Sequence, residues 1–163
     1  MNEKEFKKLI NKKLYQIFIF ESRLPVPFQF ATHSWIVTSN KGKIKRWDLI
    51  WSRIIGKDSS KGHVYLNMIA PWVGMNKYLF KGAPKYPSKL IGYSEGNKNS
   101  LTEKAIKFLD KNARKYPFKK RYRIYPGPNS NTFIQWFLDK FPELEIRLSR
   151  RAFGKNYLRN SIP

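Results

Sequence analysis

The sequence predicts a single α+β domain in which an antiparallel sheet packs against helices. Its 163 residues, 41% of them hydrophobic and 16% aromatic, are enough to form one packed core. Strand-like segments fill most of the first half of the chain, whereas the longer helical periodicities come in the second half. A hairpin turn at Ser39–Gly42 joins two of the strands, which is typical of antiparallel pairing. Strands followed by helices indicate the α+β class.

The first half begins with a short amphipathic helix, expected at about Glu3–Leu14, and continues as strands. Four segments rich in aromatic and β-branched residues are expected to be strands: Gln16–Phe20, Phe28–Thr38, Lys43–Trp51 and His63–Ala70. In the third of these, Lys45, Trp47, Leu49 and Trp51 share one face, so we expect it to be half buried. Asp58–Gly62 is expected to be a loop.

The second half is expected to alternate loops with two helices. Trp72–Lys89 contains several glycines and prolines and is expected to be an irregular covering loop before a short strand at Leu90–Ser94. Ser100 and Glu103 have the spacing of a capping box, and an apolar helix face follows as far as Tyr116. A second helix begins near Ser130 and stops at Pro142, and Glu145–Ser149 is expected to close the fold as a strand.

Composition excludes several classes of protein. The chain has no cysteine, so it has no disulfides, thiolate metal ligands or cysteine nucleophiles, and its two histidines predict no metal site and no cofactor. No segment reaches the ~18 consecutive apolar residues of a membrane span, so we expect no transmembrane segment and a cytoplasmic protein. The net charge of +22 is either suited to a polyanion, such as nucleic acid or anionic lipid, or a consequence of lysine-rich composition.

The most informative stretch is Gly127–Phe133, which follows a rigid turn rich in proline. An apolar stripe at helical spacing comes after it, formed by Phe133, Ile134, Phe137, Leu138 and Phe141. Ser130 is therefore expected in the first helical turn, where free N–H groups and the helix dipole favour a developing anion. Two interpretations stay open: Ser130 is a nucleophile, or the Asn-Ser-Asn run is ordinary helix capping.

The run Tyr122–Phe133, followed by Pro142–Leu144 and Ala152–Tyr157, closely resembles the bacterial family called domain of unknown function 3750. His33–Ile36 and Lys115–Phe118 also resemble that family's pattern. The resemblance covers most of the chain and implies one domain, 1–163, with an N-terminal helix and strand at 1–27 and a family-like core at 28–157. It implies no activity, because the family's activity is unknown.

Asn129–Phe133 is also similar, more distantly, to the Asn-Cys-Asn-x-Phe helix start of papain-like hydrolases with permuted chain order. These include the PPPDE peptidases, the lecithin:retinol acyltransferase group and permuted NlpC-type amidases. In them a strand carries the histidine and a later helix start carries the cysteine, and His33 precedes Ser130 in the same order. The similarity implies a permuted papain-like (NlpC-like) architecture. Because Ser130 stands at the cysteine position and serine is almost never ionised near pH 7, a general base is obligatory.

His33 is the candidate base, since it lies in a strand with Ala31, Trp35 and Val37 on its own face. The alternative is a satisfied core histidine. A third group would orient the ring, and His63, Asp48 and Asn67 are the candidates on neighbouring strands, with His63 ranked slightly first because of the papain-like similarity. Of Asn129 and Asn131, one is expected to cap the helix and the other to donate toward an oxyanion.

Two functions follow from these residues. The first is an acyl hydrolase or transferase acting on an amide, ester or thioester, with Ser130 attacking and His33 carrying the proton. The second is a non-catalytic descendant of the papain-like fold that binds a polyanion or a protein through its basic surface. A basic C-terminal cluster suited to phosphate is the candidate contact region for a polyanion: Arg147, Arg150, Arg151 and Lys155.

Overall fold

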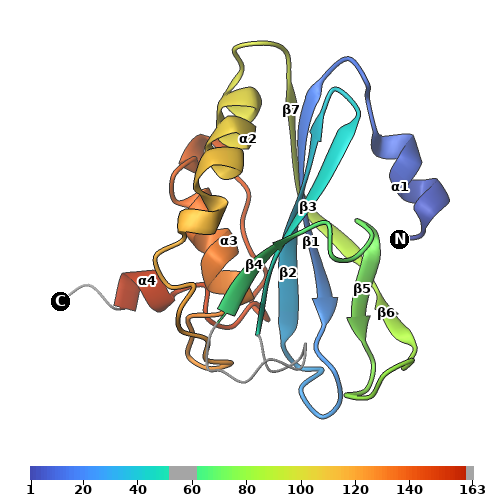
Figure 1. Ribbon diagram of the computed structural model, residues 1–163, viewed down its shortest axis with the longest axis vertical. Helices are drawn as coiled ribbons and strands as arrows, with labels where there is room; N and C mark the ends of the chain where they lie inside the picture. Colours follow the sequence, from blue (N-terminus) through green and yellow to red (C-terminus); the bar gives the residue numbers. More distant parts are fainter. Residues whose placement is uncertain (52–61, 161–163) are drawn as a thin grey trace.

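The computed structural model describes residues 1–51 and 62–160, and these form an α+β fold as expected (Figure 1). The main antiparallel sheet has the order β4-β3-β2-β1-β7, formed by β1 (Tyr15–Arg23), β2 (Thr32–Asn40), β3 (Lys43–Trp51), β4 (Gly62–Leu66) and β7 (Lys89–Gly96). A second sheet pairs β5 (Val73–Asn76) with β6 (Lys85–Pro87). The helices are α1 (Glu3–Leu9), α2 (Leu101–Asn112), α3 (Ser130–Leu138) and α4 (Tyr157–Asn160), with 3-10 turns at Ala113–Lys115 and Pro142–Leu144.

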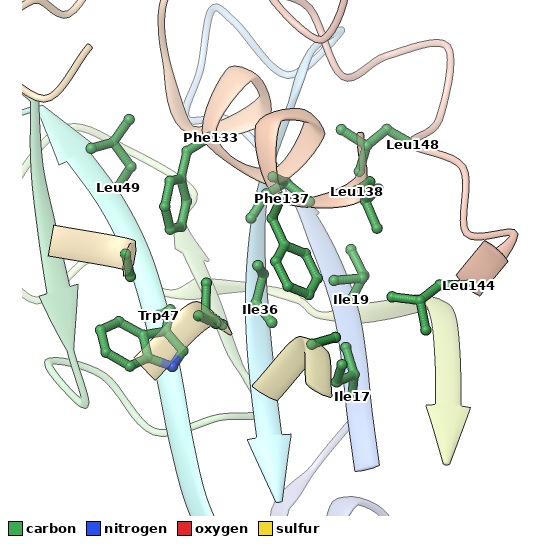
Figure 2. Close-up of a cluster of buried hydrophobic side chains, with 14 of the residues drawn as sticks. Ile17, Ile19, Ile36, Trp47, Leu49, Phe133, Phe137, Leu138, Leu144 and Leu148 are labelled. Atoms are coloured by element: carbon green, nitrogen blue, oxygen red, sulfur yellow. The ribbon is translucent and has the colours of Figure 1, made fainter. Parts of the chain in front are cut away.

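The two faces of the main sheet have different coverings. Helices α2 and α3 lie on one face, while α1 and the β5–β6 pair lie on the other (Figure 1). On the helix side, Phe133 and Phe137 of α3 point toward the sheet and belong to one core with Ile17, Ile19 and Ile36 of the central strands (Figure 2). All five side chains are fully buried. Burying a side chain of this size contributes about 1.5–3 kcal/mol, so this contact fixes α3 on the sheet.

The opposite face is buried as well. Phe18, Phe20, Trp35 and Val37 form a second core with Phe6 of α1, and Trp72 and Leu90 pack against it. Because α1 and the chain near β5 cover this face, the strand β3 is buried on both sides from Arg46 to Ile50. The expectation of a half-buried strand was wrong for this reason.

Several element ends differ from expectation. Helix α1 ends at Leu9 instead of Leu14, β2 begins at Thr32 instead of Phe28, and β4 ends at Leu66 instead of Ala70. Asn67 has a left-handed φ of 55°, which breaks the extended strand there. Before β2, the Ala31 N–H donates to the Phe28 carbonyl and closes a turn in place of the strand.

Two predicted segments have a different secondary structure. The covering loop expected at Trp72–Lys89 contains β5 and β6, whose strands of four and three residues are too short to stand out among its glycines and prolines. The segment Glu145–Ser149 is not a strand: Glu145 has a φ of 55°, and Ile146 packs on Gly92 of β7 in place of backbone pairing. The loop expected at Asp58–Gly62 lies outside the described residues except for Gly62.

Candidate active site

A cavity of about 430 Å³ opens at the end of the main sheet where β2 begins and β3 ends. Its lining is mostly apolar, and His33, Ser130 and Tyr122 are among the few polar side chains that reach it. A pocket of this size with a few convergent polar groups is typical of a small-molecule site. The two residues that the sequence singles out for catalysis therefore line one cavity.

Ser130 is the first residue of α3, and it does not cap the helix. The N-cap is Asn129, whose side-chain oxygen accepts from the backbone N–H groups of Asn131 (3.0 Å) and Thr132 (3.3 Å). Thr132 completes a capping box by accepting from the Asn129 N–H. Because Asn129 performs the capping, the Ser130 hydroxyl is not needed for it.

The side chains on either side of Ser130, those of Asn129 and Asn131, hydrogen-bond backbone carbonyls of other segments. Asn131 donates from Nδ2 to the carbonyls of Thr32 (2.8 Å) and Phe153 (2.9 Å). Asn129 donates from Nδ2 to the carbonyls of Ile124 (2.9 Å) and Phe153 (3.1 Å). Each side-chain amide has only two N–H groups, so both are fully used. Neither Asn129 nor Asn131 has a side-chain donor left for an oxyanion, in contrast to the expectation for one of them.

A glycine permits the close approach that holds this motif in place. Gly154 has a φ of +89°, and a Cβ there would lie 2.4–2.7 Å from the side-chain amide of Asn129. The Gly154 carbonyl accepts from the Thr132 hydroxyl at 2.8 Å. The C-terminal segment therefore clamps the start of α3, and any larger residue at 154 would push the two apart.

Tyr122 is the partner of Ser130 and was not among the predicted site residues. Its hydroxyl hydrogen-bonds with both the side chain and the backbone of Ser130, and its ring stacks on Trp51 at 6.2 Å. Burial raises the pKa of Tyr122 to about 12, and the hydrogen bonds with Ser130 offset only part of that rise. Tyr122 is therefore a neutral hydroxyl near pH 7, able to donate a hydrogen bond but not to act as a base.

His33 is held by a buried carboxylate. Its Nε2 lies 3.1 Å from Asp48 Oδ1, and the side chains of both residues are almost fully buried. An ionised carboxylate can only accept, so Nε2 carries the proton and donates it to Asp48. In the neutral form of the ring the lone pair is then on Nδ1, which forms no hydrogen bond within the described part of the chain. Nδ1 is therefore the nitrogen available as a base.

Arg46 keeps Asp48 ionised. Its Nε and Nη2 donate to the Asp48 carboxylate at 2.6 and 3.2 Å, and its guanidinium lies 4.1 Å from the centre of the Trp35 ring. Burial alone would raise the pKa of Asp48, but the hydrogen bond from His33 and the charge of Arg46 outweigh it, so the net pKa lies below its ordinary value. Arg46 also donates from Nη1 to the carbonyls of Ala70 and Val73, so the network is anchored to the start of β5 and to the chain just before it.

Asp48, and not His63, is the group that orients His33. His63 lies on β4, opposite Ile50 of β3, so a whole strand separates it from β2. Two strand spacings amount to roughly 9–10 Å, which is too far for a hydrogen bond. Asn67 is also excluded, because its backbone N–H and its Oδ1 both bond the backbone of Arg46.

Ser130 and His33 reach the cavity from different sides of the sheet. We expected them to meet across the contact between helix and sheet, but the His33 ring stacks on Trp35, on the face opposite to α3. The two residues instead share the cavity at the end of the sheet. In the described part of the chain no hydrogen bond joins the His33 ring to the Ser130 hydroxyl, so direct or one-water contact between them stays a prediction.

The basic C-terminal cluster does not line the cavity. Arg147, Arg150 and Arg151 are exposed, whereas Lys155 donates from Nζ to the carbonyls of Leu148 and Ser149 and helps to hold this segment. Within residues 1–51 and 62–160, no group of three or more His, Asp or Glu side chains is placed to hold a metal ion.

Comparison with known proteins places this α+β domain in a family. The profile of the family described as "Protein of unknown function (DUF3750)" matches residues 15–157, which is most of the chain. The chain belongs to that family, as the resemblance of its motifs indicated. No match was found among curated proteins or among solved structures. Among the described residues, no helix has the length and apolar character needed to cross a membrane.

Proposed function

We propose that the protein is an acyl hydrolase or transferase of permuted papain-like type, with Ser130 as nucleophile and His33 as general base. One observation carries the proposal: the capping role belongs to Asn129, so a serine without a capping duty lines the same cavity as a histidine held by a buried carboxylate. A nucleophile, a base and a group that orients the base are the three parts that acyl transfer needs.

The tautomer of His33 determines the path of the proton during the reaction. As the Ser130 oxygen attacks the substrate carbonyl carbon, its proton passes to Nδ1, and Asp48 stabilises the resulting imidazolium through Nε2–H. The tetrahedral intermediate then expels the amine, alcohol or thiol, which takes the proton from Nδ1. Water, or another acceptor in a transferase, attacks the acyl-serine ester in the same way and regenerates the Ser130 hydroxyl.

The oxyanion is stabilised by groups at the start of α3. Both side-chain amides are committed elsewhere, so the donors are the neutral hydroxyl of Tyr122 and the backbone N–H of Ser130, supported by the helix dipole. The Ser130 N–H is bonded to the Tyr122 oxygen in the free protein and would turn to the oxyanion once the substrate displaces that bond. The apolar lining favours an acyl group as the part of the substrate that enters the cavity.

A non-catalytic binding protein is the second candidate. It is favoured by the hydrogen bond between the Tyr122 hydroxyl and Ser130, because the Tyr122 hydroxyl then occupies the position that a substrate oxygen would take beside Ser130. In this case the cavity would bind an apolar ligand without reaction, and the basic surface would bind a polyanion or a protein.

Labelling with a serine-directed fluorophosphonate separates the two candidates. The active enzyme should be labelled at Ser130. Ser130→Ala and His33→Gln should each abolish the labelling while the protein stays folded, because a glutamine amide at position 33 can still donate to Asp48. Ser149→Ala, at a described serine that does not line the cavity, provides the control and should leave the labelling intact. Absence of labelling in the wild-type protein, or labelling that survives His33→Gln, would exclude the Ser130–His33 mechanism.

A cysteine variant tests the same geometry without needing the correct substrate. A thiol is much closer to ionisation at neutral pH than a hydroxyl, and a nearby base increases its reactivity. Ser130→Cys should react with iodoacetamide faster than a free thiol, and adding His33→Gln should return the rate to that of a free thiol. A rate that does not depend on His33 would favour the binding protein.

A further inference from the structure

The mouth of the cavity is surrounded by exposed apolar side chains. Among the described residues, every large hydrophobic side chain with substantial exposure belongs to four loop segments at this mouth, except Met68 and Tyr93. Six of them also line the cavity, and we call these six the apolar rim: Phe28, Phe30, Leu79, Ile124, Tyr125 and Phe153. Tyr125 is 75% exposed and Leu79 is 71% exposed, so water surrounds most of their surface.

The rim forms one continuous surface. Ring contacts run from Phe28 to Phe30 (6.4 Å), from Phe30 to Phe153 (6.0 Å) and from Phe153 to Tyr125 (6.2 Å). Leu79 joins it through the loop between β5 and β6, which is tied to the loop between β1 and β2 by the Val26 N–H donating to the Lys77 carbonyl. Both loops lie at the lower end of the molecule in Figure 1. Contiguous exposed apolar surface of this kind marks an interaction site.

The four described segments that carry the rim contain charged residues of one sign only. The rim lies on segments 23–31, 75–82, 121–129 and 150–157, which contain arginine and lysine but no aspartate or glutamate. Lys77 and Lys81 bracket the exposed run Tyr78–Phe80, and Arg121 and Arg123 precede Ile124. Apolar side chains that project between cations are suited to a surface that offers hydrocarbon and negative charge together, which is the interface of an anionic bilayer.

We propose that this face docks on an anionic lipid bilayer. The apolar rim enters the boundary between headgroups and acyl chains, and the flanking lysines and arginines contact lipid phosphates. The mouth of the cavity then faces the bilayer, so a lipid acyl chain can enter it without passing through water. The inference goes beyond the reaction proposed above and holds whether or not Ser130 is a nucleophile.

Neither nucleic acid nor a protein surface accounts for both features. Nucleic acid matches the charge, but it needs no rim of exposed phenylalanine and leucine around a cavity. A protein partner would match the apolar area, yet nothing in an ordinary protein surface requires cations on every segment of the rim. The bilayer interface requires apolar insertion and positive charge at the same place, and the four segments provide both.

Co-sedimentation with vesicles tests the apolar part of the proposal. The full chain should bind vesicles of equal parts phosphatidylcholine and phosphatidylserine, and bind vesicles of phosphatidylcholine alone far more weakly. Leu79→Ser should lower the partition coefficient about ten-fold, because a leucine that enters the bilayer loses most of its contact with water. Met68→Ser, at an exposed apolar residue outside the rim, should leave binding unchanged. Equal losses in the two variants would overturn the proposal.

Charge variants test whether the position of the cations matters. Lys77→Gln with Lys81→Gln should lower partitioning about ten-fold, whereas Lys4→Gln with Lys8→Gln, which removes the same charge from α1, should have little effect. Ser130→Ala should bind vesicles like the wild type, which separates this proposal from the catalytic one. Equal losses from the two lysine pairs, or tighter binding to single-stranded RNA that does not depend on Leu79, would overturn the docking proposal.

Discussion

The two halves of the candidate site are held by different forces. The serine half, at the start of α3, is fixed by hydrogen bonds from neutral side chains to backbone carbonyls: Asn131 to Thr32 and Phe153, and Asn129 to Ile124 and Phe153. The histidine half, on β2 and β3, is fixed by a buried ion pair between Asp48 and Arg46, to which His33 is hydrogen-bonded.

Because of this difference, the two halves should respond differently when a side chain is substituted. Neutral hydrogen bonds contribute about 0.5–1.5 kcal/mol each, so the serine half should weaken stepwise as they are removed. In a buried charge network each partner cancels the desolvation cost of another, so removal of one charge leaves a second one unpaired. Removal of either charge should therefore destabilise the whole histidine half.

The largest expected effect comes from breaking the charge network. Asp48→Ala leaves the fully buried Arg46 guanidinium without a counter-charge, which should lower the free energy of unfolding by about 3–5 kcal/mol. Urea denaturation followed by tryptophan fluorescence measures this loss. Asp110→Ala, which removes an exposed partner of Lys45, serves as the matched control and should cost about 1 kcal/mol or less. Similar values for the two variants would contradict the picture of a buried network.

The next effect concerns the serine half. Asn129→Ala removes the helix cap and leaves the carbonyls of Ile124 and Phe153 without that donor, so we expect a loss of about 2–4 kcal/mol in the free energy of unfolding. Asn129→Asp should recover the capping part, because its carboxylate can still accept from the first-turn N–H groups. If Asn129→Asp is no more stable than Asn129→Ala, the cap is not what holds this half.

Acid should affect the histidine half more than the serine half. The folded-state pKa of Asp48 lies below its unfolded value of about 3.9, so its contribution to stability is complete above that pH and is lost as the pH falls through the folded-state pKa. Stability measured from pH 6 downward should therefore decline below about pH 4. Asp48→Asn should flatten part of this decline, whereas Asn129→Ala should shift the curve without changing its slope.

The same difference explains what could be predicted from the sequence. The serine half is local, because a proline-rich turn, a cap and an apolar stripe at helical spacing all occur within 125–141. The helix start at Ser130 was therefore predicted correctly. Its contacts with Thr32 and Phe153 depend on segments far away in the chain, and no local pattern contains them.

The histidine half depends on tertiary structure and was predicted less well. His33 was identified, but its partner was ranked wrongly, because Asp48 lies on the face of β3 that alternates with Trp47 and Leu49 and so resembles a solvated face. That face is buried because α1 and the chain near Trp72 cover it, and no local pattern signals this covering. Arg46 and Tyr122 were missed although their partners Asp48 and Ser130 are close in sequence, because only burial in the folded chain gives these contacts a role in the site.

The smallest expected effect on stability comes with the largest expected effect on chemistry. Ser130→Ala removes a hydroxyl that caps nothing, and alanine is favourable in a helix, so the free energy of unfolding should change by about 1 kcal/mol or less through the lost bond to Tyr122. Asn129→Ala one residue earlier should cost clearly more, although both residues begin the same helix. Thermal and urea unfolding of the two variants, beside their fluorophosphonate labelling, measure stability and chemistry separately. If Ser130 is catalytic, the Ser130→Ala variant should keep near wild-type stability and lose the labelling. If Ser130 is structural, this variant should lose as much stability as Asn129→Ala.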